Sequence, residues 1–409
     1  MERLPSEIGN LPSLKDLDLT ATSISDLPES VRNLSSLQCL GLGDCHELWL
    51  LPELPSSLQG LDLCKSDKLR SLPKLPSSLQ RLGIMSCKEL QSLPELPLSL
   101  QYLDLRECHK LQSLPELPSG LTFLRITCKS FELPQIFSLI HLEDLILEVI
   151  HLPEDICELP SIPLKLCFEE LDGLTYLKIE GLTHLEELSI KKCSSIKTLS
   201  LSGLIHLKRL RIEHCDSLAK IEGYDKLESL EVIFLSECKC LKKFTASKCG
   251  NLVELQGLDG MKLLEELDFT GCKSMETLPD LTGCKKLRSL RLQDCKKLAQ
   301  FRGHEMLNLT YLDISGCDSL EAIPNLSGCD SLEELDFTGC KSMETLLDLT
   351  RCKKLRSLRV QDCKKLAQLR GLETLNLTYL DISGCDSLEA IPNLSGTHVY
   401  RNYELRPCF

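Results

Sequence analysis

The amino-acid sequence predicts an α/β-type repeat solenoid, in which one small unit is stacked many times. Three observations support this prediction. About 92 of the 409 residues are leucine, whereas the chain contains one Trp, seven Tyr and ten Phe. The leucines recur in the spacing L-x-x-L-x-L-x-x-C-x-x-L with a period of roughly 21 to 23 residues. Two long segments are also nearly identical, and their offset is a whole number of such periods.

The repeated spacing is clear from Leu79 to Leu90 and recurs from Leu100 to Leu111. About seventeen such units fit the chain, a recurrence that is typical of leucine-rich repeats. The ninth position of the unit is Thr22 or Ser66 in two places and cysteine in thirteen: Cys45, Cys87, Cys108, Cys193, Cys215, Cys238, Cys249, Cys272, Cys295, Cys317, Cys340, Cys363 and Cys385.

Each unit should contribute one short strand. The last two leucines of L-x-x-L-x-L are two residues apart, so they share one face of a strand while the residues between them point the other way. A single unit cannot bury these leucines, but stacked units can, with strands about 4.8 Å apart. We therefore expect a leucine-rich repeat horseshoe with a concave parallel β-sheet and a mostly irregular, extended or short helical convex side.

The ninth position lies where the chain leaves the strand and turns inward. Cysteine suits this position because it behaves as a small buried hydrophobe with a weak S–H donor. Parallel side-chain directions suit disulfides poorly, and burial raises a thiol's pKa. The closest approach to a C-x-x-C zinc half-site is Cys238-Lys239-Cys240. We therefore expect these thirteen thiols to be free and unreactive in the folded chain, and we expect no metal and no cofactor.

The repeats change character along the chain. Residues 1–128 include 21-residue units with LPxLP segments, where pairs such as Pro52 and Pro55 forbid a regular helix. Residues 129–173 break the period and are expected to form irregular repeats or an island. Residues 174–396 return to units of 22 or 23 residues, and residues 397–409 form a tail.

An internal duplication lies within the last group of repeats. Residues 263–328 match residues 331–396 at about 59 of 66 positions, with an offset of 68 residues, which equals three units. Duplication by whole repeats lengthens a solenoid without disturbing its packing, because each unit contacts only its neighbours. The duplication therefore presents the same surface twice.

The outward positions of the strands are the predicted partner-binding surface. Solenoids offer extended concave surfaces, and aromatic and arginine side chains dominate protein interfaces. We expect a protein partner to contact this candidate set on the concave face: Tyr102, Asp104, Arg106, Phe123, Arg125, Tyr176, Lys178, Arg209, Arg211, Arg291, Tyr311, Arg359 and Tyr379.

Catalytic motifs are absent from the sequence, including the P-loop, G-x-S-x-G and H-E-x-x-H patterns. His214, Cys215 and Asp216 are adjacent, but Cys215 belongs to the cysteine positions, and adjacency is not triad geometry. A net charge of -13 disfavours nucleic acid. The first ten residues do not resemble a signal peptide, and no window is long and apolar enough to span a membrane. We expect a non-enzymatic, cytoplasmic protein.

The segment from Leu14 to Ser30, the LEELDFTGCKSMETLPDL units and the cysteine positions resemble the repeat region of plant intracellular nucleotide-binding disease-resistance receptors, especially those of the TIR type. This resemblance covers nearly the whole chain. It implies recognition of pathogen effectors, or of host proteins that effectors modify, and contact with a nucleotide-binding domain in cis or in trans. No TIR or nucleotide-binding segment is present in the sequence, so the resemblance implies recognition without ATP exchange.

Two alternatives remain open. The LPELPSSL segments also resemble bacterial effectors that join leucine-rich repeats to a cysteine ubiquitin ligase, although no further domain follows in this sequence. An extracellular leucine-rich repeat receptor would require glycosylation at the N-L-[ST] sequons, which lie at Asn33, Asn308, Asn325, Asn376 and Asn393.

Overall fold

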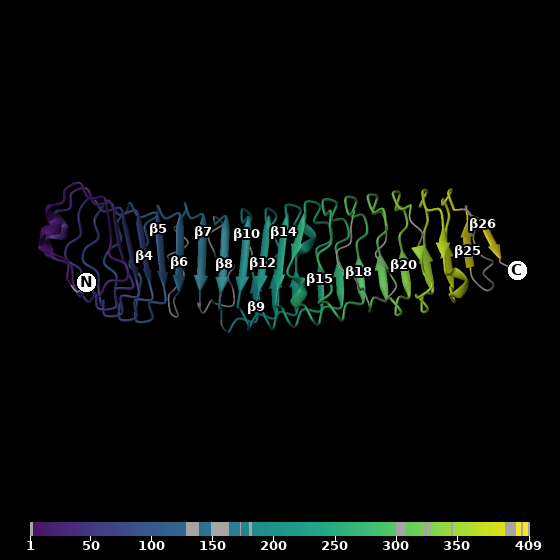
Figure 1. Ribbon diagram of the computed structural model, residues 1–409, viewed down its shortest axis with the longest axis horizontal. Coiled ribbons are helices and arrows are strands. Elements are labelled where there is room, and N and C mark those ends of the chain that lie inside the picture. The colour runs from purple at the N-terminus through teal and green to yellow at the C-terminus, as the bar shows by residue number, and fades with distance from the viewer. Residues whose placement is uncertain are drawn as a thin grey trace. The chain divides into compact units, whose positions relative to one another are not determined.

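The structure is a computed structural model in which the chain forms two compact units, Met1–Leu174 (unit 1) and Thr175–Phe409 (unit 2). Each unit is a stack of coils whose strands follow one another in chain order (Figure 1). The described residues are 3–127, 139–148, 163–171, 173–179, 182–299, 308–322, 326, 329–344, 347–388, 398–401 and 404–407.

Unit 1 contains one parallel sheet with one strand from each coil. Two 3-10 helices, η1 (Ser6–Asn10) and η2 (Glu29–Asn33), belong to its first coils. Neighbouring strands pair without a shift, so that Leu40 lies beside Leu61 and Leu61 beside Leu82. The strands are β1 (Asp16–Asp18), β2 (Cys39–Gly43), β3 (Gly60–Cys64), β4 (Arg81–Met85), β5 (Tyr102–Arg106), β6 (Phe123–Thr127), β7 (Asp144–Glu148) and β8 (Lys165–Glu169).

The leucine pattern explains this sheet. The second and fourth residues of the five-residue strands are buried, as Leu82 and Ile84 are in β4, while the first, third and fifth residues face outward. The LPxLP segments return without regular secondary structure, and each ends in a turn such as the one in which the Leu58 amide donates to the Pro55 carbonyl oxygen at 3.2 Å. The predicted leucine-rich repeat fold, with its parallel sheet and largely irregular return, is confirmed.

Unit 2 differs because most of its early coils carry two strands, one in each of two sheets. The first sheet contains β10, β12, β14 and β16, and a second contains β9, β11 and β13. Their bounds are β9 (Tyr176–Lys178), β10 (Glu187–Lys191), β11 (Thr198–Ser200), β12 (Arg209–Glu213), β13 (Lys220–Glu222), β14 (Val232–Ser236) and β16 (Glu254–Gln256). Short helices η4 (Tyr224–Lys226), η5 (Leu258–Gly260) and η6 (Leu372–Thr374) lie between strands.

Within unit 2, the strands that precede the cysteine positions belong first to one sheet and then to another. Cys215 and Cys238 follow β12 and β14 of the first sheet, but Cys249 comes only 11 residues after Cys238 and follows β15 (Lys243–Thr245), which lies beside β13. From there a third sheet runs through β17 (Glu266–Asp268), β18 (Ser289–Arg291), β19 (Tyr311–Asp313), β20 (Glu334–Asp336), β22 (Ser357–Arg359), β24 (Tyr379–Asp381), β25 (His398–Arg401) and β26 (Glu404–Pro407). A further pair is β21 (Leu347–Asp348) with β23 (Leu369–Arg370). The repeat pattern therefore continues while its position in the coil shifts by half a turn.

The segment expected to be irregular, 129–173, lies partly outside the described residues. Its described parts supply β7 and β8, which pair in parallel with β6 and with each other. The predicted tail contributes β25, parallel to β24, and β26, antiparallel to β25. The boundary between the two units, at Leu174, lies next to the point at which the longer repeats were predicted to begin.

All thirteen cysteines at the ninth position are buried and free. The Cys45 thiol donates to the Leu19 carbonyl oxygen of the preceding coil at 3.3 Å. The same contact measures 3.2 Å at each of four later positions, Cys272, Cys295, Cys317 and Cys340. Burial raises the pKa of Cys87, Cys238, Cys249 and Cys317 to about 12. These four thiols are therefore protonated at neutral pH.

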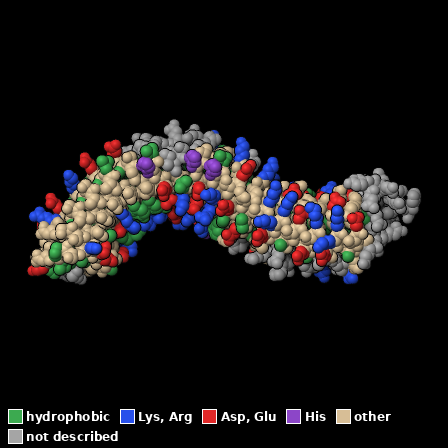
Figure 2. Space-filling view, turned by 90° about the horizontal axis from the view of Figure 1, so that it is seen from above, with side chains coloured by type: hydrophobic (Ala, Val, Ile, Leu, Met, Phe, Trp, Pro, Cys, Tyr) green, Lys and Arg blue, Asp and Glu red, His purple; other side chains and the backbone are tan. Residues whose placement is uncertain are grey.

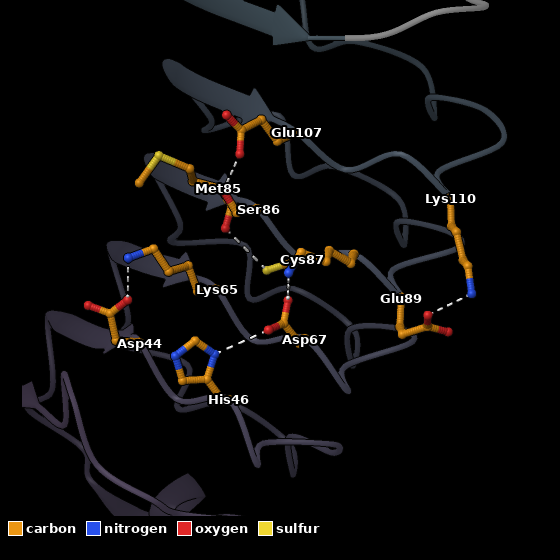
Figure 3. A network of polar contacts seen from close by, with 11 residues as sticks. Asp44, His46, Lys65, Asp67, Met85, Ser86, Cys87, Glu89, Glu107 and Lys110 are labelled. Carbon is orange, nitrogen blue, oxygen red and sulfur yellow. Dashed lines mark hydrogen bonds and ion pairs between the residues drawn. The ribbon is translucent and has the colours of Figure 1, made fainter.

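The residue before each cysteine position supports the turn in unit 1. Asp44, Lys65, Ser86 and Glu107 all adopt positive φ angles between 51° and 54°. Figure 3 shows their side chains linking neighbouring coils, with Lys65 Nζ 2.9 Å from Asp44 Oδ1 and Ser86 Oγ donating to Glu107 at 2.5 Å. Exposed ion pairs contribute only about 0–1 kcal/mol each, so these contacts mainly fix the spacing of the turns.

Thiol accessibility provides a first test of this packing. We expect the exposed Cys39 and Cys240 to react rapidly with an aromatic disulfide reagent, and the sixteen buried thiols to react only after denaturation. In the double variant Cys39→Ser/Cys240→Ser, the rapid phase should contain two fewer reactive thiols. The number of thiols that react only after unfolding should not change. Rapid titration of most thiols in the native chain would contradict the burial of the cysteine positions.

Candidate recognition surface

The outward residues of unit 1 form three rows across its strands. Because the strands pair without a shift, Arg81, Tyr102 and Phe123 are register partners in the first row. Gly83 and Asp104 are neighbours in the second row. Side chains that are far apart in the sequence therefore lie side by side on one sheet face.

An aromatic stack stands at one side of this face. The rings of Tyr102 and Phe123 are 4.2 Å apart at the centroids and 8° from parallel. The guanidinium carbon of Arg81 lies 4.7 Å from the Tyr102 ring centroid. Each cation–π contact of this kind contributes about 0.5–1 kcal/mol at exposed sites. The three side chains therefore form an ordered wall of aromatic and cationic groups.

A hollow of about 200 Å³ lies beside the aromatic stack. Gly41, Gly43 and Gly83 occupy outward strand positions and line the hollow, and side chains of neighbouring strands lie close above them. A β-carbon at Gly83 would lie 2.5 Å from Asp62 Oδ1, and one at Gly41 would lie 3.0 Å from Asp18 Oδ1. The glycines therefore allow the Asp62 and Asp18 carboxylates to approach the strands closely beside the hollow.

Paired charges line the hollow. Arg106 Nε donates to Asp104 Oδ1 at 2.9 Å, and Arg81 Nε lies 3.5 Å from Asp62 Oδ1. The Tyr102 hydroxyl donates to Asp104 Oδ2 at 3.4 Å, and burial together with the Asp104 charge raises the pKa of Tyr102. A partner side chain entering the hollow would meet two guanidinium groups, two carboxylates and the edge of a fixed aromatic stack. This combination suits recognition of a polar protein side chain.

The structure brings together five of the sequence-predicted site residues in unit 1: Tyr102, Asp104, Arg106, Phe123 and Arg125. All five lie on β5 and β6, and Arg125 reaches across to Glu169 of β8 at 3.9 Å. Sequence reasoning missed Arg81 and the three glycines. The glycines carried a signal, because glycine is unfavourable in a strand unless something needs the space.

The predicted residues of unit 2 are not brought together on one sheet. Tyr176 and Lys178 lie on β9, whereas Arg209 and Arg211 lie on β12 of the other sheet. Arg211 stacks on Phe234 at 4.6 Å, a contact that the sequence analysis did not identify. The remaining four residues lie on the third sheet: Arg291, Tyr311, Arg359 and Tyr379.

The adjacent His214, Cys215 and Asp216 do not form a catalytic arrangement. Cys215 is buried, and its thiol donates to the carbonyl oxygens of Ile190 and Glu213 at 3.8 and 3.5 Å. Asp216 Oδ2 accepts a hydrogen bond from Lys239 Nζ at 3.0 Å. Within the described ranges no group of three or more potential metal ligands is present, and no helix there is long and apolar enough to cross a membrane.

Short segments of the chain are similar to plant disease-resistance proteins. A stretch of 52 residues, 13% of the chain, is 54% identical to TMV resistance protein N of Nicotiana glutinosa. A stretch of 55 residues is 40% identical to a probable disease resistance protein of Arabidopsis thaliana. These stretches span only 4% and 3% of the lengths of the two relatives. No protein-family model matches the chain.

Solved leucine-rich repeat structures also align with the chain. YopM from Yersinia pestis is 24% identical, with a TM-score of 0.44, over 79% of this chain and 88% of that one. The functional domain of InlJ from Listeria monocytogenes, described as including a cysteine ladder, is 17% identical with a TM-score of 0.39, over 91% of this chain and 74% of that one. The assignment of the fold rests on the repeat geometry of the chain itself.

Proposed function

We propose that the chain is a non-catalytic protein-recognition module, and that the face around the unit 1 hollow is its recognition surface. The observation that carries this proposal is the ordered stack of Arg81, Tyr102 and Phe123 beside a hollow whose lining includes three glycines and two carboxylates. Aromatic and arginine side chains beside a recess are the usual centres of protein interfaces.

The biological setting we propose is plant innate immunity, with pathogen effectors or the host proteins that they modify as partners. The similarity of short segments to TMV resistance protein N supports this setting. A cytoplasmic location and contact with a nucleotide-binding domain, in cis or in trans, belong to the same proposal. Recognition would then be the role of this chain, and signalling the role of that domain.

Filling the hollow tests this function. In Gly83→Leu the new side chain would occupy the space between Asp62 and Asp104, and only the end of the half-exposed Asp62 side chain would have to move. We expect partner proteins to be retained at least tenfold less, about 1.4 kcal/mol, because the recess is filled while the aromatic stack remains. Immobilised wild-type and variant chains would be exposed to leaf extract, and retained proteins quantified by mass spectrometry.

The matched control is Gly250→Leu, which adds the same side chain where a β-carbon meets nothing within 4 Å. We expect this control to retain the same proteins as the wild type, with unchanged thermal midpoints for both variants. If wild type, Gly83→Leu and Gly250→Leu retain the same proteins to the same extent, the unit 1 hollow is not the recognition surface.

A further inference from the structure

The two copies of the internal duplication lie side by side in one sheet. The first supplies β17, β18 and β19, and the second supplies β20, β22 and β24. Their register is continuous, with Glu266 beside Ser289, Ser289 beside Tyr311, and Tyr311 beside Glu334. The copies are therefore related by a shift of three strands, about 14 Å at a strand spacing of about 4.8 Å.

The outward side chains of these six strands are identical between the two copies. The matching pairs are Glu266 and Glu334, Asp268 and Asp336, Ser289 and Ser357, Arg291 and Arg359, Tyr311 and Tyr379, and Asp313 and Asp381. The seven positions that differ between the copies are not among these pairs and lie at 263, 279, 283, 292, 301, 304 and 306 of the first copy. Two of their counterparts, Leu347 and Leu369, belong to β21 and β23. The six strands therefore present the same outward side chains in both copies.

The geometry of these side chains is also repeated. Arg291 lies 5.0 Å from the Tyr311 ring centroid, and Arg359 lies 5.2 Å from that of Tyr379. The two tyrosine hydroxyls donate to the aspartate two residues later, at 3.3 Å in the first copy and 3.4 Å in the second. The two copies therefore share the arginine–tyrosine–aspartate contacts, and in the second copy Arg359 Nη1 also lies 3.5 Å from Asp336 Oδ2.

The charge of this face is acidic. Each copy presents three outward carboxylates and one guanidinium on its strands, a net charge of −2. Where the copies meet, Asp313 and Asp336 are direct register partners. Like charges placed opposite each other are unfavourable, and Arg359 Nη1, 3.5 Å from Asp336 Oδ2, offsets some of this repulsion. Each copy still presents more carboxylates than guanidinium groups, which favours a basic partner. In Figure 2, acidic and basic side chains interleave along this part of unit 2.

We propose that the duplicated face holds two equivalent sites for one partner, an extended basic segment that carries the same basic element twice. An extended chain advances about 3.3–3.5 Å per residue, so two elements four residues apart would reach both copies. Such a partner would bind through two linked contacts, and the second contact would add affinity through effective concentration. This surface is separate from the unit 1 hollow and does not depend on its role.

Labelled peptides test the proposal by fluorescence anisotropy and calorimetry at 150 mM salt. One probe carries a single Arg-Arg pair in a Gly-Ser background, and the other carries two pairs whose first residues are two to ten positions apart. We expect the full chain to bind two single-pair peptides but one double-pair peptide. Affinity for the double-pair probe should rise at least tenfold when the spacing reaches four residues, and should decline slowly at longer spacings.

Two charge variants separate the sites. Asp268→Asn/Asp313→Asn alters the first copy, and Asp336→Asn/Asp381→Asn alters the second. Asparagine keeps the oxygen that accepts the backbone N–H two residues later in each case, so the turns are preserved. Each variant should bind one single-pair peptide with an unchanged dissociation constant, and should bind the double-pair probe no better than the single-pair probe.

The matched control, Glu95→Gln/Glu116→Gln, removes two exposed charges from unit 1 and should change neither peptide's binding. Gly83→Leu should also leave both unchanged, so failure of the unit 1 hollow and failure of this proposal are distinguishable. The proposal would be overturned if the wild type bound only one single-pair peptide, or if the two charge variants had unequal effects. It would also be overturned if the affinity for the double-pair probe did not depend on the spacing of its pairs.

Discussion

Raising the pH from 8 to about 10.5 should unfold the chain at 25 °C in the absence of denaturant. In the folded chain, burial raises the pKa of eight thiols above the ordinary value of 9.0. The pKa is about 12 for Cys87, Cys238, Cys249 and Cys317, and about 11 for Cys329. It is also raised for Cys272, Cys295 and Cys340. The contribution of these protonated thiols to the free energy of unfolding is fully present below pH 9. It is lost as the pH rises toward 12, because in this range the thiols ionise only in the unfolded chain. Above pH 9 each thiol lowers the free energy of unfolding by about 1.4 kcal/mol per pH unit. At pH 10.5 the sum over the eight thiols exceeds a typical stability of about 5–15 kcal/mol.

The measurement is the free energy of unfolding in urea at pH 8, 9, 9.5 and 10, under a reducing agent. Lysine and tyrosine residues also titrate near pH 10, so single substitutions isolate the thiol contribution. Cys317→Ala should reduce the slope above pH 9 by about 1.4 kcal/mol per pH unit, whereas Cys240→Ala at an exposed site should leave it unchanged. A stability that stays flat between pH 9 and 10 would show that the ladder thiols are not held in their protonated form.

The cysteine positions also show how far the sequence predicts this fold. Each of the thirteen is buried as expected, because the L-x-x-L-x-L spacing fixes which side chains share the inner face of a strand. Ser66, which replaces cysteine in one unit, is completely buried as well. The Thr22 hydroxyl, in another, donates to the Leu19 carbonyl oxygen at 2.7 Å. The local pattern is therefore sufficient to predict the strands and their inward residues.

The assignment of strands to sheets could not be predicted in the same way. In unit 2 the apolar spacing occurs on both sides of a coil, as at Leu188 in β10 and Leu199 in β11, so the sequence alone does not say which side continues the earlier sheet. The 11-residue step from Cys238 to Cys249 is the signal that was available. A residue predicted to face a partner, such as Tyr176, consequently lies on a different sheet from Arg209.

The unit 1 hollow was missed for a different reason. Large side chains at outward positions, such as Tyr102 and Phe123, follow from the strand pattern, but the hollow depends on how residues of several coils are placed beside one another. Gly41, Gly43 and Gly83 lie on neighbouring or nearby strands only because the register brings them together. Such a space depends on pairing between coils, which single-repeat patterns do not contain.

Gly257→Ala should destabilise unit 2 by about 3 kcal/mol or more, for two separable reasons. Gly257 has a φ of +84°, a conformation that costs alanine about 1–2 kcal/mol. Its β-carbon would also lie 2.2 Å from the carbonyl oxygen of Leu235, in strand β14 of the preceding coil. That oxygen belongs to backbone rather than to a flexible side chain, so the turn between β16 and η5 would have to move.

Two other glycines separate the backbone contribution from the contact. Gly203 has a φ of +88° but meets nothing within 4 Å, so Gly203→Ala should cost only the backbone term of about 1–2 kcal/mol. Gly250 is open and has no positive φ, so Gly250→Ala should be neutral or stabilising by about 0.5 kcal/mol. Urea midpoints from circular dichroism measure all three. If Gly257→Ala costs no more than Gly203→Ala, the coils are not packed as closely at this turn as the contact with Leu235 requires.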